Sequence, residues 1–404
     1  MNVFKKAYCR AYQKVIFLVQ NLLHFPVPET LEGSGALSLV AEKLQKEGKS
    51  HPLILATPSM IRNGYLPKLT KPLEEKGIAY EVFTKIEPNP PFPIVEEAYA
   101  IFASCSCDCL VALGGGSTLD TAKAVGAKAT NPKKSLAKFK GVLKVGKKIP
   151  YLVAIPSTAG SGSEATVAAV VVNPENHDKF SISDPHLIPS LAVLDADLLA
   201  SLPQKLIAYT GMDALTHALE SYLGKAGTSL SKKTALESME LIRDNLLDFY
   251  CDPSLASARQ GMQKAAFLAG VSFTRGYVGY VHALAHSLGG LYGVAHGYAN
   301  AVLLPHVLEA YGQSAEKKLA KAASFLKLAP ENSTRTEQAD ALISWVKELN
   351  EKMGIPDKFA NLIHDEDLDK LALHADKEAN PLYPVPKEMS QKELKKILLE
   401  VKES

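Results

Sequence analysis

The chain has 404 residues, of which 47% are hydrophobic and 22% charged, and its formal net charge is +2. This length favours two domains, and the near balance of charge gives no indication of a nucleic-acid partner or an acidic membrane surface. Five cysteines, an odd number in so long a chain, argue against a disulfide scaffold and favour a reducing compartment, for which we expect the cytoplasm.

An N-terminal amphipathic helix is predicted for about residues 1–24. Basic residues precede an apolar run over residues 15–23, as in a signal peptide, but Gln20 and Asn21 interrupt this run and no small-residue cleavage site follows it. We therefore expect the helix to pack on its own protein, with export as the less favoured alternative. No stretch of the chain is long and apolar enough to predict a membrane span.

Alternating strand and helix patterns fill the first half of the chain. Four short apolar runs predict buried strands, at residues 52–56, 110–113, 151–155 and 192–194. Such alternation is typical of a parallel sheet covered by helices on both faces. From about Pro203 the pattern changes to long helical periodicities with almost no strand signal. We predict an α/β domain over residues 1–202, including the N-terminal helix, and an all-helical domain over residues 203–404.

A glycine-rich turn, Gly114 to Ser117, follows the second of these strands and leads into a predicted helix. Glycines let the backbone approach a ligand, and a helix N-terminus offers N–H groups that suit a pyrophosphate. The turn matches neither the G-x-G-x-x-G fingerprint nor a Walker A loop, so a plain tight turn stays an open alternative. Small and hydroxylated residues at 157–164 follow the next strand, at the edge where open parallel sheets bind ligands.

Candidate metal ligands occur at helical spacing in the second half. Asp213 and His217 are four residues apart and project from one helix face, and His282 and His286 form a second such pair. His296 follows after a glycine-containing interruption. One carboxylate and three imidazoles can surround a divalent metal and leave a position for a substrate oxygen. One such pair alone is usually a packing feature, but five ionisable groups in apolar segments need partners and indicate a metal site.

Over nearly its full length the chain resembles the iron-containing alcohol dehydrogenases. The resemblance rests on motifs that occur in the same order: residues 87–90, the 114–117 turn with Asp120 and Lys123, residues 157–164, Asp184-Pro185, residues 211–220 and residues 282–306. It implies an N-terminal dinucleotide-binding domain with a parallel sheet, an all-α metal-binding domain, and an active site in the cleft between them.

The resemblance also implies roles for individual residues. The metal would be held by four side chains of the helical domain, Asp213, His217, His282 and His296. His286 would lie near the nicotinamide and the substrate without binding the metal. The cofactor would be held by residues of the α/β domain: Thr57, Asn89, Gly115, Gly116, Ser117, Asp120, Ser157, Thr158, Ser161, Thr166 and Lys179. Phe273 would form an aromatic wall of the substrate pocket.

Two departures from the family pattern bear on specificity. Many members that use NAD carry an Asp after the second-strand equivalent, where it can bind the ribose hydroxyls, whereas this chain has Thr57-Pro58-Ser59. Without that carboxylate a 2′-phosphate is not repelled, so NADP becomes possible beside NAD. Ala168 lies in the segment after Thr166 where some members place a polar substrate contact, which favours a simple alcohol or aldehyde over a polar diol.

These features predict a metal-dependent, NAD(P)-linked alcohol dehydrogenase or aldehyde reductase. We expect Fe²⁺, with Zn²⁺ or another divalent metal as an alternative, to act as a Lewis acid on the substrate oxygen while hydride passes between the substrate and the nicotinamide. His286 would relay the proton. Two rivals share the fold, a metal-independent reductase of the maleylacetate-reductase type and a lyase of the dehydroquinate-synthase type. We expect a small alcohol or aldehyde as partner, no nucleic acid or membrane, and a homodimer or larger homo-oligomer.

Overall fold

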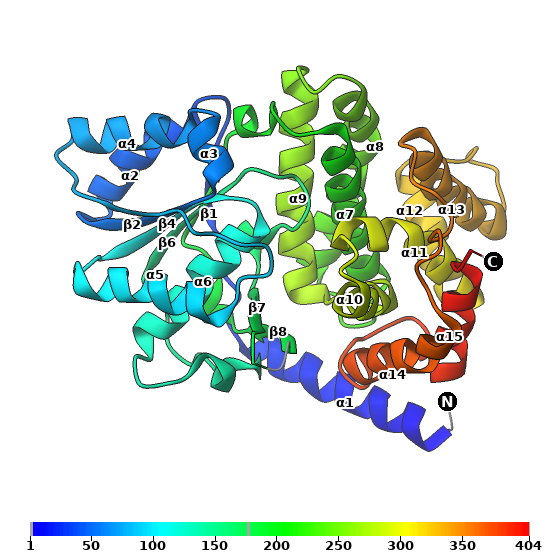
Figure 1. Ribbon diagram of the computed structural model, residues 1–404. Helices are drawn as coiled ribbons and strands as arrows, with labels where there is room; N and C mark the ends of the chain where they lie inside the picture. The colour runs from blue at the N-terminus through cyan, green and yellow to red at the C-terminus, as the bar shows by residue number, and fades with distance from the viewer. Residues whose placement is uncertain (1–2, 176–177, 404) are drawn as a thin grey trace. The chain divides into compact units, whose positions relative to one another are not determined.

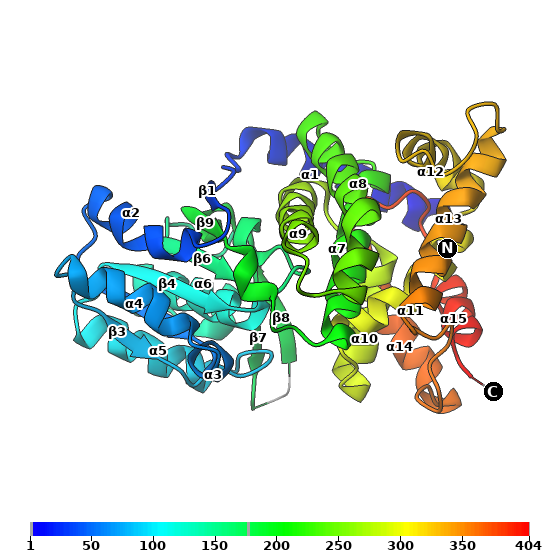
Figure 2. The ribbon, with the colours of Figure 1, turned by 90° about the horizontal axis from the view of Figure 1, so that it is seen from above.

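The computed structural model describes residues 3–175 and 178–403, and its contacts divide the chain into two compact units (Figures 1 and 2). The α/β unit comprises Phe25–Leu202 and Pro253–Gly270. The helical unit comprises Met1–His24, Pro203–Asp252 and Val271–Ser404, of which residues 3–24, 203–252 and 271–403 are described.

A six-stranded parallel sheet forms the centre of the α/β unit, with the strand order β1-β9-β6-β4-β2-β3. The strands are β1 (Glu29–Glu32), β2 (Pro52–Ala56), β3 (Glu81–Phe83), β4 (Cys109–Gly114), β6 (Tyr151–Pro156) and β9 (Leu191–Leu194). The four strands that the apolar runs predict are the four inner strands. The predicted fold class, a parallel α/β domain followed by a mainly helical one, is confirmed.

Both faces of this sheet are buried beneath helices. Leu110 and Ala112 of β4 point into one core with α5 (Phe92–Ser104) and α6 (Gly116–Thr130). Val111 and Leu113 point into the opposite core with α2 (Val40–Lys46) and α4 (Tyr65–Glu75). Figure 1 shows the two helical layers on either side of the sheet. Because successive residues of a strand face opposite sides, a strand covered on both faces is apolar throughout, which is why these runs are visible in the sequence.

Shorter elements complete the α/β unit. The helix α3 (Pro58–Arg62) follows β2, and a three-stranded sheet is formed by β5 (Gly141–Val142), β7 (Ala168–Asn173) and β8 (Asp178–Ser183). The strands β7 and β8 pair antiparallel, and β5 pairs with β8. The strands β7 and β8 are absent from the strands predicted from the sequence. In β8 apolar residues such as Phe180 alternate with polar ones, as in a strand that is covered on one side only.

The described residues of the helical unit are mainly in helices. These helices are α1 (Val3–Leu22), α7 (Gln204–Leu223), α8 (Ser229–Cys251), α10 (Tyr280–Tyr292), α11 (His296–Tyr311), α12 (Gln313–Phe325), α13 (Arg335–Lys352), α14 (Leu368–Ala379) and α15 (Gln391–Glu400). The helix α9 (Ala256–Gly276) contributes residues to both units. Among the described residues, no helix combines the length and the apolar character needed to cross a membrane.

Two segments are grouped differently from the sequence-based division at residues 202 and 203. Residues 253–270, most of α9, belong to the α/β unit, where Arg259 Nε donates a 3.0 Å hydrogen bond to the carbonyl of Ala196. In the same unit the backbones of Gly162 and Gly270 touch, since a Cβ atom on Gly270 would lie 2.5 Å from the oxygen of Gly162. The N-terminal helix belongs to the helical unit instead of the α/β unit. That the two halves are separately folding domains stays a prediction.

The helix α1 is fixed by polar contacts with residues 376–388. Lys5 Nζ lies 2.8 Å from a carboxylate oxygen of Asp376, and Gln13 Nε2 donates a 2.8 Å bond to the carbonyl of Tyr383. Arg10 forms an ion pair with the buried carboxylate of Glu388 and donates to the carbonyl of Val385 at 2.8 Å. The helix therefore packs on its own chain, as predicted, through the face that carries these residues.

Arg10→Ala is expected to lower the free energy of unfolding by about 1–3 kcal/mol, the cost of leaving a buried charged group without its partner. The reason is that Glu388 is only 6% exposed and its carboxylate would lose the guanidinium. The matched control is Lys14→Ala on an exposed position of the same helix, which changes helix propensity similarly. Thermal unfolding monitored by circular dichroism measures both variants. Equal shifts in the two variants would contradict a contribution from the ion pair.

Candidate active site

Four side chains of the helical unit converge on one point. Asp213 and His217 lie on one face of α7, His282 lies in the first turn of α10, and His296 is the first residue of α11. One potential ligand atom from each of the four lies within 4.8 Å of all the others. Asp213 Oδ1 is 3.4 Å from His296 Nε2 and 4.0 Å from His282 Nε2. The set that the resemblance implies is thus brought together from three helices.

The chemistry of this cluster suits a divalent cation. Three of the four residues are at most 5% exposed, and His296 is partly exposed at the rim. Burial, followed by the neighbouring histidines, lowers the pKa of His282 well below its ordinary value, so its imidazole is neutral and can offer a lone pair. A neutral imidazole and a carboxylate are the donors that Fe²⁺ and Zn²⁺ accept. The residues present therefore fit the metal that the sequence predicts.

Asn300 adds a further polar group at the centre of the cluster. It lies one turn after His296 on α11 and is fully buried. Its Nδ2 is 2.8 Å from Asp213 Oδ1, 3.2 Å from His296 Nε2 and 3.4 Å from His282 Nε2. The amide nitrogen donates to Asp213 and lies within hydrogen-bond distance of two imidazole nitrogens, so polar atoms of three residues of the cluster converge on one point. Such a point suits a divalent cation.

Glu220 holds His282 from behind. Its Oε2 lies 2.6 Å from His282 Nδ1 and accepts the N–H of Gly279 at 2.7 Å, and its Oε1 accepts the N–H of Val281 at 2.8 Å. With Nδ1 turned to this carboxylate, Nε2 of His282 is the nitrogen that faces Asp213. Burial raises the pKa of Glu220 to about 7, against the effect of these hydrogen bonds. A carboxylate behind a histidine is a usual support of metal sites.

Glu220 is absent from the predicted site residues, although it lies in the matched stretch 211–220. Asp213, His217 and Glu220 have the spacing i, i+4 and i+7, which places all three on one face of α7. That spacing is the signal by which Glu220 could have been found. Asn300 carries a similar signal, because it is four residues after His296.

Phe273 and His286 border the cluster. The ring of Phe273 stacks on His217 with centroids 4.2 Å apart, so the residue expected to wall the substrate pocket lies directly against a predicted ligand. The ring of His286 stacks on His296 at 5.1 Å and is outside the four-residue set. His286 Nδ1 lies 2.7 Å from Glu378 Oε1. Its predicted role near the nicotinamide and the substrate stays a prediction.

The glycine-rich turn of the α/β unit lies where the sequence predicts it. The strand β4 ends at Gly114, Gly115 precedes α6, and Gly116 is the first residue of that helix. A Cβ atom on Gly116 would lie 3.2 Å from Ser161 Oγ, and one on Gly115 would lie 3.6 Å from Thr158. The turn and residues 157–162 are therefore adjacent. Because α6 has 15 residues, its N-terminus offers N–H groups and a partial positive charge beside these hydroxyls.

Other predicted cofactor residues lie around this turn. Ser117 Oγ accepts the N–H of Asn89 at 3.3 Å, and Ser157 N–H donates to the carbonyl of Gly114 at 3.0 Å. Thr57 follows β2 and precedes α3, with its Oγ1 2.8 Å from Ser59 Oγ. Lys179 lies on β8 and is exposed. The direct contacts of all these residues with a cofactor stay a prediction.

Asp120 and Lys123 connect α6 to the segment 163–170. The two carboxylate oxygens of Asp120 accept the hydroxyl of Ser163 at 2.9 Å and the N–H of Val170 at 3.1 Å. The buried ammonium of Lys123 donates to the same hydroxyl and, at 2.9 Å, to the carbonyls of Thr166 and Ala168. These bonds fix the loop that carries several predicted cofactor and substrate contacts. Asp120 thus has a structural function in addition to its predicted cofactor role.

Lys123→Met is expected to change how stability depends on pH. Burial lowers the pKa of Lys123 to about 8, against the effect of Asp120 and Glu164. Between about pH 8 and the ordinary lysine pKa of 10.5 the unfolded chain binds more protons, so this lysine makes the folded state more stable as pH rises. The stability of the wild type relative to the variant should increase by up to about 3 kcal/mol over that window. Urea denaturation of both proteins at pH 8, 9 and 10 measures it, and a constant difference would contradict the prediction.

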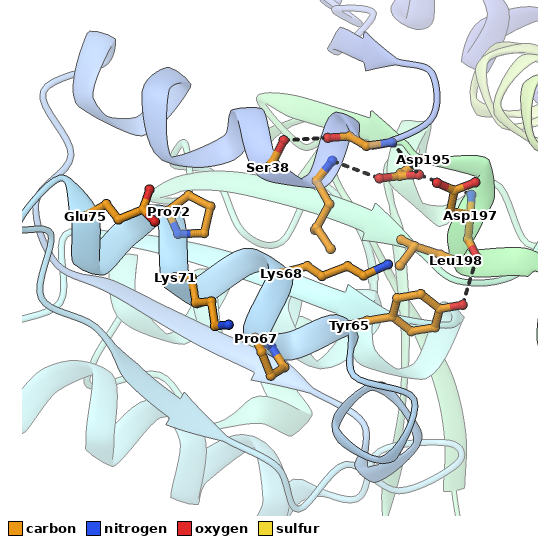
Figure 3. A pocket seen from close by; sticks show the side chains of 12 residues that line it. Ser38, Tyr65, Pro67, Lys68, Lys71, Pro72, Glu75, Asp195, Asp197 and Leu198 are labelled. Atoms are coloured by element: carbon orange, nitrogen blue, oxygen red, sulfur yellow. Dashed lines mark hydrogen bonds between the residues drawn. The ribbon is translucent and has the colours of Figure 1, made fainter.

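A separate pocket of about 280 Å³ lies on the α/β unit beside α4 (Figure 3). Lys68 and Lys71 of α4 extend along it, and Asp195 and Asp197 lie at its end. Asp195 accepts the N–H of Leu37 at 3.0 Å, and Tyr65 donates to the carbonyl of Asp197 at 2.8 Å, so these polar groups already bond within the unit. None of the described residues that line it belongs to the predicted cofactor or metal sets.

Comparison with known proteins identifies the family. The model of the iron-containing alcohol dehydrogenases matches residues 28–196, and the model of the C-terminal part of that family matches residues 207–401. The chain belongs to the iron-containing alcohol dehydrogenase family. The resemblance drawn from the sequence motifs is thereby confirmed, and so is the class of enzyme, an alcohol dehydrogenase.

Individual family members resemble the chain over most of its length. It is 36% identical to 1,3-propanediol dehydrogenase of Klebsiella pneumoniae over 376 residues, which are 92% of this chain and 94% of that protein. It is 33% identical to NAD-dependent methanol dehydrogenase of Bacillus methanolicus over 352 residues, covering 87% and 92% of the two chains. The crystal structure of a 1,3-propanediol oxidoreductase has a TM-score of 0.90 and 33% identity, covering 94% of this chain and 99% of the other.

Proposed function

We propose that the protein interconverts a small alcohol and the corresponding aldehyde or ketone, with a nicotinamide cofactor and a divalent metal held by Asp213, His217, His282 and His296. The observation that carries this proposal is the convergence of four ligand atoms within 4.8 Å in the helical unit. It argues against the metal-independent rival of the maleylacetate-reductase type, which would not need such a set. Membership in the iron-containing family supports a dehydrogenase over the lyase rival.

The bound groups and the residues that hold them would have different roles in the reaction. A metal in the cluster supplies Lewis-acid activation of the substrate oxygen, and the nicotinamide takes or gives the hydride. Asp213 brings the negative charge of the ligand set, while Glu220 and Asn300 keep His282 and Asp213 in place. His286, beside His296, would move the proton at its Nε2 atom.

Residues of the α/β unit would hold the cofactor. The N–H groups at the start of α6 and the hydroxyls of Thr158 and Ser161 would bind the pyrophosphate, since a helix N-terminus favours an anion. We propose that the substrate is a simple alcohol or aldehyde. Ala168, half-buried at the start of β7, offers no polar side chain to a second hydroxyl, and one relative is named as a dehydrogenase of methanol, an alcohol with a single hydroxyl.

The function is tested by following NADH and NADPH consumption with a panel of short aldehydes. We expect turnover that a chelator abolishes and that Fe²⁺ or Zn²⁺ restores in the chelated protein. Equal turnover with and without a tightly bound metal, measured on protein whose metal content is determined directly, would favour the metal-independent rival. Release of phosphate from a phosphorylated sugar acid without net change in NAD(P)H would favour the lyase.

Thr57→Asp is expected to shift the preference between cofactors toward NAD. Thr57 follows β2, and α3 begins at the next residue, Pro58, so Arg62 lies in the last turn of a short helix near this position. A threonine offers one hydroxyl and no repulsion of a 2′-phosphate, so we expect the wild type to use both cofactors with a modest preference. The variant's ratio of kcat/KM for NADH over NADPH should rise by about 10-fold, the scale of one contact of 1–2 kcal/mol. A wild type that already rejects NADPH would show that another residue sets the specificity.

We also propose that the protein works in the cytoplasm as a homodimer or larger homo-oligomer. The five cysteines all lie in the described part of the chain, and none of them forms a disulfide bond, which agrees with a reducing compartment. Light scattering coupled to size-exclusion chromatography determines the oligomer size, and fractionation of the producing cells determines the compartment.

A further inference from the structure

A carboxylate and a phenol lie behind His286 in the helical unit. Glu378, near the end of α14, places Oε1 2.7 Å from His286 Nδ1 on α10. The hydroxyl of Tyr383 donates a 2.8 Å hydrogen bond to the same Oε1 atom. Glu378 is 92 positions from His286 in the sequence, so the helical packing alone brings the two side chains together.

This contact determines which nitrogen of His286 carries the proton. A carboxylate only accepts hydrogen bonds, so Nδ1 must be protonated to donate to Glu378. In the neutral ring the lone pair is then on Nε2, and any proton that the ring takes from substrate or water enters there. The ring also stacks on His296 with centroids 5.1 Å apart and an interplanar angle of 19°, so it is held on two sides.

Glu378 is present as the anion that such an arrangement needs. Burial opposes its ionisation, but the charge of His286 and the hydrogen bonds from His286 and Tyr383 outweigh burial and lower the pKa of Glu378 below its ordinary value. An anion beside Nδ1 holds the ring in one orientation and keeps the proton of the neutral ring on Nδ1, as in other carboxylate–histidine pairs.

The segment that carries Tyr383 is itself fixed by α1. Gln13 Nε2 donates a 2.8 Å bond to the carbonyl of Tyr383, and Arg10 Nη1 donates a 2.8 Å bond to the carbonyl of Val385. The family match begins at residue 28, so α1 precedes the matched region. This helix therefore contributes to holding the phenol that bonds Glu378.

We propose that Glu378, supported by Tyr383, is a positioning residue that fixes the orientation and the tautomer of His286, so that Nε2 exchanges the proton of the reaction. This inference rests on the proposed function. In the oxidation direction the C–H bond of the alcohol breaks and its electron pair leaves as hydride to the oxidised nicotinamide. The O–H proton goes to Nε2 of His286 and from there to water, so that the alcohol is oxidised and the nicotinamide is reduced. Reduction of the aldehyde runs through the same steps in reverse.

Three variants test the inference against a matched control. Glu378→Leu removes the acceptor, Glu378→Gln keeps an acceptor oxygen but removes the charge, and Tyr383→Phe removes only the supporting hydroxyl. The control is Asp369→Asn, an exposed carboxylate on the same helix α14. The measurements are kcat and KM for one aldehyde and for the cofactor, the bound metal per chain, and ¹⁵N NMR of labelled histidines in the Zn²⁺-loaded protein, with His286→Gln used to assign the signal.

We expect Glu378→Leu to lower kcat by about 10- to 100-fold, the range for loss of a supporting contact, with the cofactor KM and the metal content nearly unchanged. Glu378→Gln should retain more activity than Glu378→Leu, and Tyr383→Phe should lose least. The NMR signal of His286 should show the Nδ1–H tautomer in the wild type and lose it in Glu378→Leu.

The inference is overturned if Glu378→Leu keeps both the wild-type kcat and the Nδ1–H tautomer. It is also overturned if kcat and metal content fall together in Glu378→Leu and Glu378→Gln alike, because that result shows a purely structural role. The tautomer is measured without turnover. A wild type that reduces no aldehyde therefore counts against the proposed function, whereas the NMR result still decides whether Glu378 orients His286.

Discussion

His217→Ala is expected to remove bound metal and turnover together. His217 is only 5% exposed, shares the α7 face with Asp213 and belongs to the set of four whose ligand atoms converge. Removing a supporting residue of a metal site already costs about 10- to 100-fold in affinity or activity. Loss of a ligand should therefore lower metal affinity by at least about 100-fold, with kcat falling in proportion to the metal that is lost.

Metal content per chain, determined by atomic emission after gel filtration, measures this effect directly. The matched control is His374→Ala, an exposed histidine of the same unit, which should retain both metal and activity. Glu220→Gln gives an intermediate case, because the amide oxygen can still accept from His282 but brings no charge. A His217→Ala protein with full metal content would show that His217 is not a ligand.

The four inner strands of the central sheet could be predicted from the sequence for a physical reason. Strands covered on both faces are apolar throughout, so β2, β4, β6 and β9 appear as continuous runs. Edge strands need not be apolar: β1 reads Glu-Thr-Leu-Glu, and only its two central residues are even partly buried. Such a segment has no period that distinguishes it from a loop.

The supporting residues of the site were harder to predict, because most of them act across distances in the sequence. Asp213 and His217 are visible as a pair since one helix carries both. Glu378 reaches His286 only because α14 packs against α10, and no short spacing between residues in the sequence indicates that contact. The grouping of α1 with the helical unit has the same origin, since its partners Asp376, Tyr383 and Glu388 lie at the other end of the chain.

Gly116→Val is expected to weaken cofactor binding while metal content stays intact. Gly116 is the first residue of α6, where N–H groups point toward the predicted pyrophosphate site. A branched side chain would occupy the space through which the phosphates must approach that backbone. Loss of one or two charge-assisted hydrogen bonds, at about 1.5–3 kcal/mol each, should raise the Kd for NADH and NADPH by about 10- to 100-fold or more. Fluorescence titration of the cofactor measures Kd independently of turnover.

A second route to weaker binding must be separated from this one. A Cβ atom on Gly116 would already lie 3.2 Å from Ser161 Oγ and 3.3 Å from its Cβ, so valine would also press on the neighbouring loop. Ser161→Gly removes that contact, and the double variant can be compared with Ser161→Gly alone. If valine acts by blocking the phosphates, the loss persists in the Ser161→Gly background. If binding recovers there, valine acted by displacing the loop, and the turn at Gly116 does not itself contact the cofactor.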